Sequence, residues 1–460
     1  MDATISARRR PSRLVTPLLL VLVPAFVVAA VAFPILAVTS LIPIIGFFSL
    51  PTLLSFSVFL LYSTMWILYL SLAQLDRPPT SRFILLPLSP IRAFKITLHT
   101  IVIVRDLISS NFVSLLFDLQ LRRVLILGGK DRKQIIKDNV LFGREGRRLD
   151  VYYAVKDKGL EHVPAPVVVF VGGGNWTWWS KGKAAQIALR LRRLGFVVVV
   201  PQLRQWGQVK TPGMVTDLRL ALEWVGERIK IYGGDDQQIQ VMGFGSGAHI
   251  ASLTIIQDAV VRSRDEHLMR VPTSLKGNEV EPHFDVSAGI RRCRIWGDEA
   301  RLPSIKGVIC VSGVFDVVKQ LRFESKQAIE DISALRRACG PSTSAMLQSC
   351  PSHLLYGAKE LIDPTRLPSK WLLIAGGRDR LIPYSQSVLL RLLLVGVGVQ
   401  DVRLKLYKDE THMGSLASLM HQTRYSSLFL SEIEALVADV DEEEDDGAVG
   451  DDEDGAGMDA

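Results

Sequence analysis

The sequence predicts an α/β protein, with a mainly parallel sheet that carries helices on both faces and follows two transmembrane helices. Two observations predict this class. From residue 149 onward, short apolar runs typical of strands alternate with longer helical patterns, as in a parallel sheet whose connections are helices. Before that, residues 14–75 are 62 consecutive residues without a charge. A membrane-spanning helix needs about 20 apolar residues, so this stretch has room for two.

The two spans are expected at 14–38 and 52–71, with the proline-containing segment 41–51 as the turn between them. Basic residues flank the pair on both sides, inside the 1–13 segment and again after residue 75. Lys and Arg favour the cytoplasmic side of a membrane, so both flanks and the following domain are expected in the cytoplasm. A cleaved signal peptide is the alternative, although its apolar core has only about 7 to 15 residues.

Three further segments differ in composition. Residues 76–148 mix apolar runs with charges and predict helices that lie on the membrane interface or form a packed linker. Inside the predicted α/β domain, 149–438, the polar and basic interval 262–304 fits either a lid over the site or a surface loop. Residues 439–460 contain 12 acidic residues and no basic one, which predicts a disordered tail.

The charge balance indicates the kind of partner. The formal net charge is +7, and without the acidic tail the rest of the chain carries +19. A basic body attached to a membrane suits the anionic cytoplasmic leaflet, and no zinc-finger spacing or aromatic-rich basic motif points to nucleic acid. The four cysteines have no metal-type spacing and suit free thiols in a reducing compartment, so no metal and no cofactor is predicted.

The elements of the α/β domain follow from the apolar runs and the helical patterns between them. Strands are expected at 149–155, 167–171, 196–201, 239–243, 307–312, 371–375 and 402–407, and helices at 183–193, 214–231, 248–261 and 384–395.

The segment Met242-Gly243-Phe244-Gly245-Ser246-Gly247-Ala248 joins a predicted strand to a predicted helix, where a nucleophile elbow would carry Gly-x-Ser-x-Gly. Small residues two before and two after the nucleophile let strand and helix approach closely. With Ser246 as the nucleophile these positions hold Phe244 and Ala248. With Gly243 and Gly247 as the small residues, the nucleophile position holds Gly245, which has no attacking atom. A phenyl ring fits the tight turn poorly, so packing favours the second register.

Acyl transfer also needs a base, an acid that orients it, and backbone donors for the oxyanion. A glycine cluster after a predicted strand offers the N–H groups of Gly173 and Gly174, with Gly247 as a third donor at the elbow. Asp379 and His412 follow later strands, in the chain order of acid and base in these hydrolases. Trp176, Trp178 and Trp179 are candidates for an apolar pocket or for core packing, and His249 is expected to be a structural hydrogen-bonding residue.

These motifs resemble the prenylcysteine methylesterases of the α/β-hydrolase superfamily, with kynurenine formamidases and small carboxylesterases as wider relatives. The resemblance covers about 149–430. It implies an α/β-hydrolase fold, hydrolysis of prenylcysteine methyl esters or other lipophilic esters, and a cytoplasm-facing domain on the endoplasmic reticulum or Golgi membrane. It also implies Asp379 as acid, His412 as base, and Gly173 and Gly174 as oxyanion donors.

The family pattern, Gly-x-Ser-Ala-Gly-Ala-His, has its serine at the position of Gly245 and an alanine at that of Ser246. Two hypotheses follow: an esterase that uses Ser246, and an inactive pseudo-hydrolase that serves as a membrane scaffold or binds a ligand. In the first, the Ser246 Oγ lies within about 3.2 Å of the His412 imidazole. In the second, Gly245 occupies the turn with a positive φ and Ser246 begins the helix. We expect the second arrangement, with Asp379 and His412 hydrogen-bonded.

Overall fold

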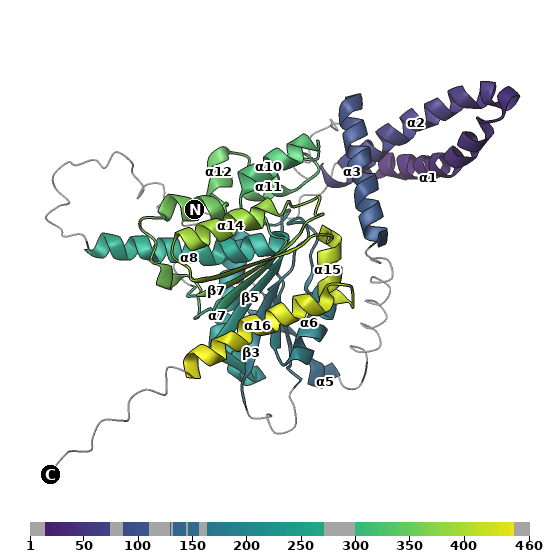
Figure 1. Ribbon diagram of the computed structural model, residues 1–460. Helices are drawn as coiled ribbons and strands as arrows, with labels where there is room; N and C mark the ends of the chain where they lie inside the picture. Colours follow the sequence, from purple (N-terminus) through teal and green to yellow (C-terminus); the bar gives the residue numbers. More distant parts are fainter. Residues whose placement is uncertain are drawn as a thin grey trace, which may run out of the picture.

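The computed structural model describes residues 14–73, 86–109, 129, 132–143, 146–155, 163–270 and 300–445. A single sheet with helices on both faces forms the body of the molecule, and two N-terminal helices project from it as an arm (Figure 1). The expected α/β class, with its mainly parallel sheet, is confirmed.

The sheet has eight strands in the order β1-β2-β4-β3-β5-β6-β7-β8. The pairs β1–β2 and β2–β4 are antiparallel, and every other neighbouring pair is parallel. The strands are β1 (Ile136–Phe142), β2 (Arg147–Tyr152), β3 (Ala165–Val171), β4 (Val197–Pro201), β5 (Gly234–Phe244), β6 (Gly307–Val311), β7 (Lys370–Gly376) and β8 (Asp401–Tyr407).

Two apolar cores cover the two faces of this sheet. Along β3, Val167 and Val169 point into one core while Val168 and Phe170 point into the other. Both faces are covered, so the central strands are continuous apolar runs rather than alternating ones. The first core lies under α7 (Thr211–Arg228), α8 (Ser246–Arg270), α13 (Pro351–Ala358) and α14 (Ser385–Gly396), and the second under α6 (Ala185–Leu191), α15 (His412–Met420) and α16 (Ser426–Asp445).

Shorter helices complete the body. They are α5 (Arg132–Ile135), α10 (Val317–Lys326), α11 (Leu335–Cys339) and α12 (Thr343–Gln348), with short 3₁₀ segments η2 (Lys181–Ala184), η3 (Arg192–Leu194), η4 (Ile229–Tyr232) and η6 (Pro364–Arg366).

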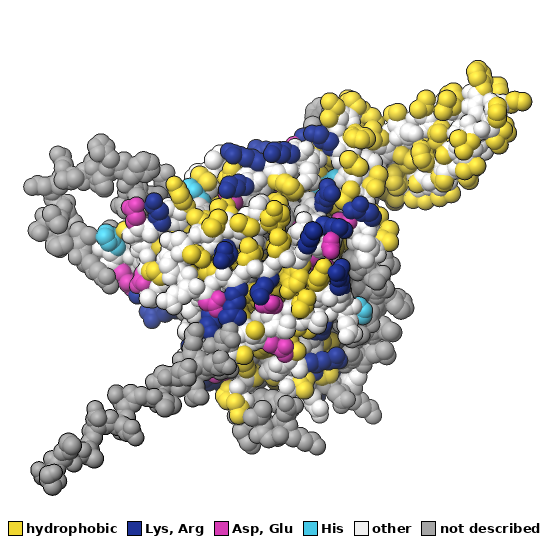
Figure 2. Space-filling model, in the orientation of Figure 1, with side chains coloured by type: hydrophobic (Ala, Val, Ile, Leu, Met, Phe, Trp, Pro, Cys, Tyr) yellow, Lys and Arg dark blue, Asp and Glu magenta, His cyan; other side chains and the backbone are white. Residues whose placement is uncertain are grey.

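The arm consists of α1 (Val15–Thr39) and α2 (Pro43–Leu72), both long and apolar enough to cross a membrane by length and composition. Figure 2 shows that apolar side chains cover the arm, whereas Lys and Arg side chains appear on the adjoining body. The turn expected at 41–51 is wrong, because α2 begins at Pro43 and continues through Pro51. Proline fits the first turn of a helix, where its missing N–H has no helical partner, so the helix begins directly after the short connection.

A third N-terminal helix, α3 (Pro90–Ser109), crosses the base of the arm and contacts α2 (Figure 1). Its Ala93 and Ile96 are buried in a small core with Met65 of α2 and with Ala328 and Ile329 of the body. The arm therefore has a packed junction with the α/β body.

The sheet and two flanking helices extend beyond the expected boundaries. The edge strand β1 lies inside the segment 76–148 that was expected to be a helical linker. The elbow helix α8 continues to Arg270, into the interval 262–304, whose residues 271–299 lie outside the described part of the chain. Likewise α16 continues to Asp445, past the expected start of the tail at 439, because its apolar face anchors the helix on the sheet and glutamate extends a helix readily.

Candidate active site

The strand β5 ends at Phe244, Gly245 forms the turn with a φ of +55°, and α8 begins at Ser246. A Cβ on Gly243 would lie 2.5 Å from the Cα of Ala248, and one on Gly247 would lie 2.0 Å from the carbonyl oxygen of Val171. Neither position has room for a side chain, so Gly243 and Gly247 are the two close-packing glycines of the elbow. Gly245 therefore occupies the position between them where the Gly-x-Ser-x-Gly pattern has serine.

His412 and Asp379 lie together at the carboxyl ends of the strands, beside this turn. The His412 Nδ1 is 2.8 Å from the Asp379 Oδ2, and Oδ1 accepts the N–H groups of Leu381 and Ile382, both at 2.8 Å. In a neutral ring that donates from Nδ1 to a carboxylate, the Nε2 has the lone pair and can act as a base. The expected hydrogen bond between Asp379 and His412 is confirmed.

The His412 ring faces Gly245. A Cβ built on Gly245 would lie 3.6 Å from both Nε2 and Cε1 of His412, in ordinary van der Waals contact. Unlike Gly243 and Gly247, position 245 has space for a side chain. That side chain would point at the nitrogen that carries the lone pair.

Ser246 points elsewhere, toward the glycine loop that follows β3. Its Oγ accepts the N–H of Gly174 at 3.1 Å and the N–H of Trp176 at 3.2 Å. No hydrogen bond joins Ser246 to His412 among the described residues. The placement of Ser246 as a nucleophile beside His412 is wrong for this structure, because consecutive residues at a sharp strand-to-helix turn project in different directions.

The expected oxyanion donors occupy different environments. The Gly174 N–H already donates to the Ser246 Oγ, and a Cβ on Gly173 would lie 3.1 Å from the Ser246 backbone nitrogen. In an elbow, the donor is the N–H of the residue after the nucleophile position. With Gly245 at that position, this donor belongs to Ser246 instead of Gly247.

His249, in the first turn of α8, is fully buried and supports the same loop. Its Nδ1 accepts the Trp176 Nε1–H at 3.1 Å, which leaves Nε2–H to donate to the Ser349 carbonyl oxygen at 2.7 Å. Burial lowers the pKa of His249 to about 4, so the ring is neutral at pH 7. The expected structural role of His249 is confirmed.

A cavity of about 350 Å³ opens in front of Gly245 and His412, within the usual volume range of small-molecule sites. The glycine loop and the three tryptophans Trp176, Trp178 and Trp179 line one side. Residues of α2 and α3 also line the cavity, and most of them are apolar: Leu68, Leu72, Ile96, His99, Thr100 and Ile103. The N-terminal helices therefore form a wall of the cavity.

Sequence reasoning missed this wall and a buried polar group in the same cavity. Glu324 of α10 accepts hydrogen bonds from the Ser333 Oγ at 3.0 Å and the Gln320 Nε2 at 3.3 Å. Burial raises the pKa of Glu324 to about 7. An isolated glutamate on a short helix has no sequence signal that separates it from a surface residue, so only the fold could reveal it.

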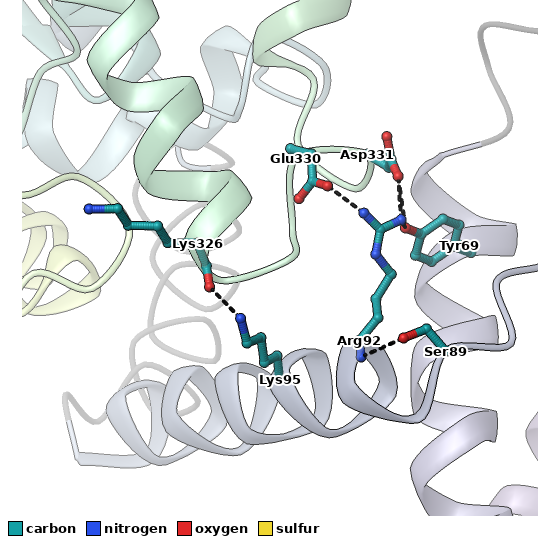
Figure 3. A network of polar contacts seen from close by, with 7 residues as sticks. All are labelled: Tyr69, Ser89, Arg92, Lys95, Lys326, Glu330 and Asp331. Carbon is teal, nitrogen blue, oxygen red and sulfur yellow. Dashed lines mark hydrogen bonds and ion pairs between the residues drawn. The ribbon is translucent and has the colours of Figure 1, made fainter.

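A polar network fixes α3 beside the cavity (Figure 3). Arg92 of α3 pairs with Glu330 and, at 2.8 Å, with the Asp331 Oδ2, which also accepts the Tyr69 hydroxyl at 3.0 Å. The Lys95 Nζ donates to the Lys326 carbonyl oxygen at 3.2 Å. These contacts join α2, α3 and the end of α10, so they fix the apolar wall on the body.

Metal ligands are not grouped in the described part of the chain, where no cluster of three or more His, Cys, Asp or Glu side chains could hold an ion. Cys310, Cys339 and Cys350 are buried free thiols, and Cys293 lies outside the described residues.

The strand order with its antiparallel β2, the elbow after β5, and the Asp379–His412 pair together define an α/β-hydrolase fold. The model of the BD-FAE family matches residues 149–394, more than half of the chain of 460 residues. The chain belongs to the BD-FAE family.

Curated relatives include plant methylesterases. The chain is 34% identical over 158 residues to the probable isoprenylcysteine alpha-carbonyl methylesterase ICME of Oryza sativa subsp. japonica, covering 34% of this chain and 36% of that protein. It is 29% identical over 155 residues to the isoprenylcysteine alpha-carbonyl methylesterase ICME of Arabidopsis thaliana, covering 34% of each. The chain thus spans about a third of the length of these relatives.

Among solved structures, the chain is similar to esterase B from Lactobacillus rhamnosis, with 18% identity and a TM-score of 0.49, covering 72% of this chain and 98% of that one.

Proposed function

We propose that the chain is a membrane-anchored protein of the carboxylic-ester hydrolase type whose cavity takes lipophilic esters, with prenylcysteine methyl esters as one class. One observation carries the proposal. One cavity is lined both by His412 and the glycine loop and by apolar side chains of α2 and α3. An ester carbonyl would lie at the polar side, while its apolar group would contact the wall from the N-terminal helices.

The residues that would act on the ester are the pair Asp379 and His412. Asp379 orients the ring, and the His412 Nε2 is the base. With glycine at position 245, this base would take a proton from a water molecule instead of a serine hydroxyl. The water oxygen would add to the carbonyl carbon, and the proton would pass from His412 to the leaving alkoxide, giving an acid and an alcohol.

A second function, binding without turnover, is favoured by two features of the elbow. Gly245 offers no attacking atom, and the Ser246 Oγ already accepts the Gly174 N–H. Hydrolysis of a lipophilic ester by the wild type, lost in His412→Ala, would support the esterase. Ester binding without His412-dependent turnover would support a pseudo-hydrolase that binds its ligand at the membrane.

The variant Gly245→Ser tests the site itself, because it places a hydroxyl beside the His412 Nε2. We expect Gly245→Ser to react with a fluorophosphonate probe and to hydrolyse lipophilic esters, and we expect both properties to require His412. Gly245→Ala is the matched control, since it adds the same Cβ at the same positive φ without a nucleophile. A folded Gly245→Ser protein that reacts no faster than Gly245→Ala would refute the proposed catalytic arrangement.

Adding Ser246→Ala to Gly245→Ser tests the role of the second serine. This change removes the hydroxyl that accepts the Gly174 N–H and so releases a donor for the oxyanion. One oxyanion donor contributes about 10²-fold or more in kcat, so we expect the double variant to exceed Gly245→Ser by at least about tenfold. An unchanged or lower kcat would show that the hydroxyl does not compete with the substrate oxygen.

A further inference from the structure

Two buried acceptor atoms, on residues that line the cavity, have no donor among the described residues. The Glu324 Oε2 and the Gln320 Oε1 are both buried and have no hydrogen-bond partner within the part of the chain that the structure describes. Both side chains line the cavity, and their residues are only 5% and 2% exposed. A buried acceptor without a donor is costly, so such a pair in a ligand cavity indicates a missing partner.

The other polar atoms of the Glu324 carboxyl group and the Gln320 amide already have hydrogen-bond partners. The Glu324 Oε1 accepts from Ser333 and from the Gln320 Nε2, and that Nε2 also donates to the Leu381 carbonyl oxygen at 2.8 Å. These bonds use both hydrogens of the Gln320 amide and fix its orientation. The two unpaired oxygens therefore belong to side chains that contact each other.

This pair lies close to the glycine loop. The Ser333 Oγ, which donates to Glu324, is also 3.4 Å from the Oδ1 of Asn175, the residue after Gly174. A ligand whose carbonyl lies at the loop would therefore bring a neighbouring substituent toward Glu324 and Gln320. The rest of the cavity is mainly apolar and suits a hydrocarbon chain.

We propose that Glu324 and Gln320 form a subsite for an ammonium group on a lipophilic ligand of this cavity. An ammonium has donors and no acceptor, so it can satisfy both oxygens at once, whereas a hydroxyl brings a single hydrogen. Its charge also compensates a buried carboxylate. The proposal rests on the proposed function, because it requires that this cavity bind a ligand.

The electrostatics of the region agree with this assignment. Burial is the main cause that raises the pKa of Glu324 to about 7, and Glu330 raises it further, while Arg337 and the hydrogen bonds lower it. His99 and His412 line the same cavity. A ligand ammonium beside Glu324 favours the ionised carboxylate and strengthens its own binding.

Two matched ligands test the subsite, N-dodecylglycinamide with an ammonium and N-dodecylglycolamide with a hydroxyl in its place. Affinities for the full chain in phosphatidylcholine nanodiscs are measured by calorimetry at neutral pH, with empty nanodiscs as the baseline. A hydrogen bond to a charged group is stronger than one between neutral groups, so we expect the wild type to prefer the glycinamide by about tenfold or more. Glu324→Gln should abolish the preference, because it weakens binding of the glycinamide much more than binding of the glycolamide.

Glu360→Gln is the matched control, because Glu360 is a surface glutamate with a side chain that is 84% exposed. It should leave both affinities unchanged. Gln320→Met is a second variant, expected to reduce the preference without abolishing it. If the wild type binds the two ligands with equal affinity, or if Glu324→Gln weakens the binding of both equally, the ammonium subsite is refuted while the lipophilic cavity is not. Binding of neither ligand by the folded wild type would overturn the proposed lipophilic cavity as well.

Discussion

Two adjacent residues determine the chemistry of the elbow. Gly245 leaves the His412 Nε2 facing a position without a side chain, and Ser246 directs its hydroxyl to the Gly174 and Trp176 amides. The serine lies one position after the place that the family pattern gives it. At this sharp turn, a shift of one position changes which groups a side chain can reach. Ser246 therefore contacts the glycine loop from the start of α8, although its sequence context resembles that of a nucleophile.

The buried His249 is expected to make the stability of the fold depend on pH. Its pKa in the folded chain is about 4, below the ordinary value of 6.5, because burial disfavours the charged ring. The stability that the neutral His249 ring contributes is therefore fully present above its ordinary pKa of 6.5. It is lost as the pH falls toward 4. Each unit of difference corresponds to about 1.4 kcal/mol, so we expect wild type to lose about 2 kcal/mol from this group between about pH 6.5 and about pH 5.

The comparison is with His249→Gln, which does not titrate in this range. The two proteins are unfolded in detergent at a series of pH values, and the difference between their unfolding free energies is followed. The wild type should lose stability relative to the variant as the solution becomes more acidic. A difference that stays constant would contradict the buried, neutral state of His249.

The helix α3 has two different faces. Ile91, Phe94, Leu98 and Ile101 form an exposed apolar stripe at helical spacing, whereas Ile96 on another face is buried at the cavity. Polar contacts from Arg92 fix the helix on the body. The helix α3 thus lines the ligand cavity with one face and, by our proposal, contacts the membrane interface with the other.

The variant Arg92→Met tests whether docking of α3 shapes the cavity. It keeps most of the apolar stem but leaves Glu330 and Asp331 without their cation, which costs about 1–3 kcal/mol for groups that are partly buried. We expect affinity for the neutral N-dodecylglycolamide to fall, by up to about tenfold. Arg105→Met is the control on the same helix, since Arg105 is 67% exposed and pairs with its neighbour Asp106. An equal effect of the two variants would refute the docking role of Arg92.

Elements with a strong local pattern were predictable from the sequence. The buried central strands are apolar runs, and Asp379 follows one of them, β7. His412 follows the edge strand β8, where Val402, Leu404 and Leu406 alternate with charged residues in a pattern that also predicts a strand. The edge strand β1 was missed because Lys137, Asp138 and Asn139 interrupt its apolar pattern. The cavity wall and the Arg92 network join residues more than 200 positions apart, and no local pattern encodes such contacts.

The apolar arm and the distribution of charge on the body support one orientation of the protein at a membrane. The arm is apolar, and Lys and Arg side chains appear on the body next to it (Figure 2). We propose that this side of the body faces the anionic cytoplasmic leaflet, with the endoplasmic reticulum or Golgi as the organelle that the methylesterase resemblance implies. The active-site cavity would then open close to the membrane surface.

Protease treatment of intact microsomes tests this orientation. A tag at the carboxyl terminus should be removed without detergent, because the proposed orientation places the α/β body in the cytoplasm. A lumenal marker protein that survives the same treatment is the control for intact vesicles. Protection of the tag until detergent is added would reverse the proposed topology.

If α2 and α3 insert in a membrane as proposed, the cavity wall that they contribute would link ligand binding to membrane insertion thermodynamically. A ligand that binds only when α3 is docked stabilises the docked state, and conditions that stabilise docking raise ligand affinity by the same factor. Lipid composition would therefore act as an effector of a site that lies in the α/β body. A version of the chain without its first three helices would keep the sheet and the Asp379–His412 pair, yet its apparent specificity would be that of a different, open cleft.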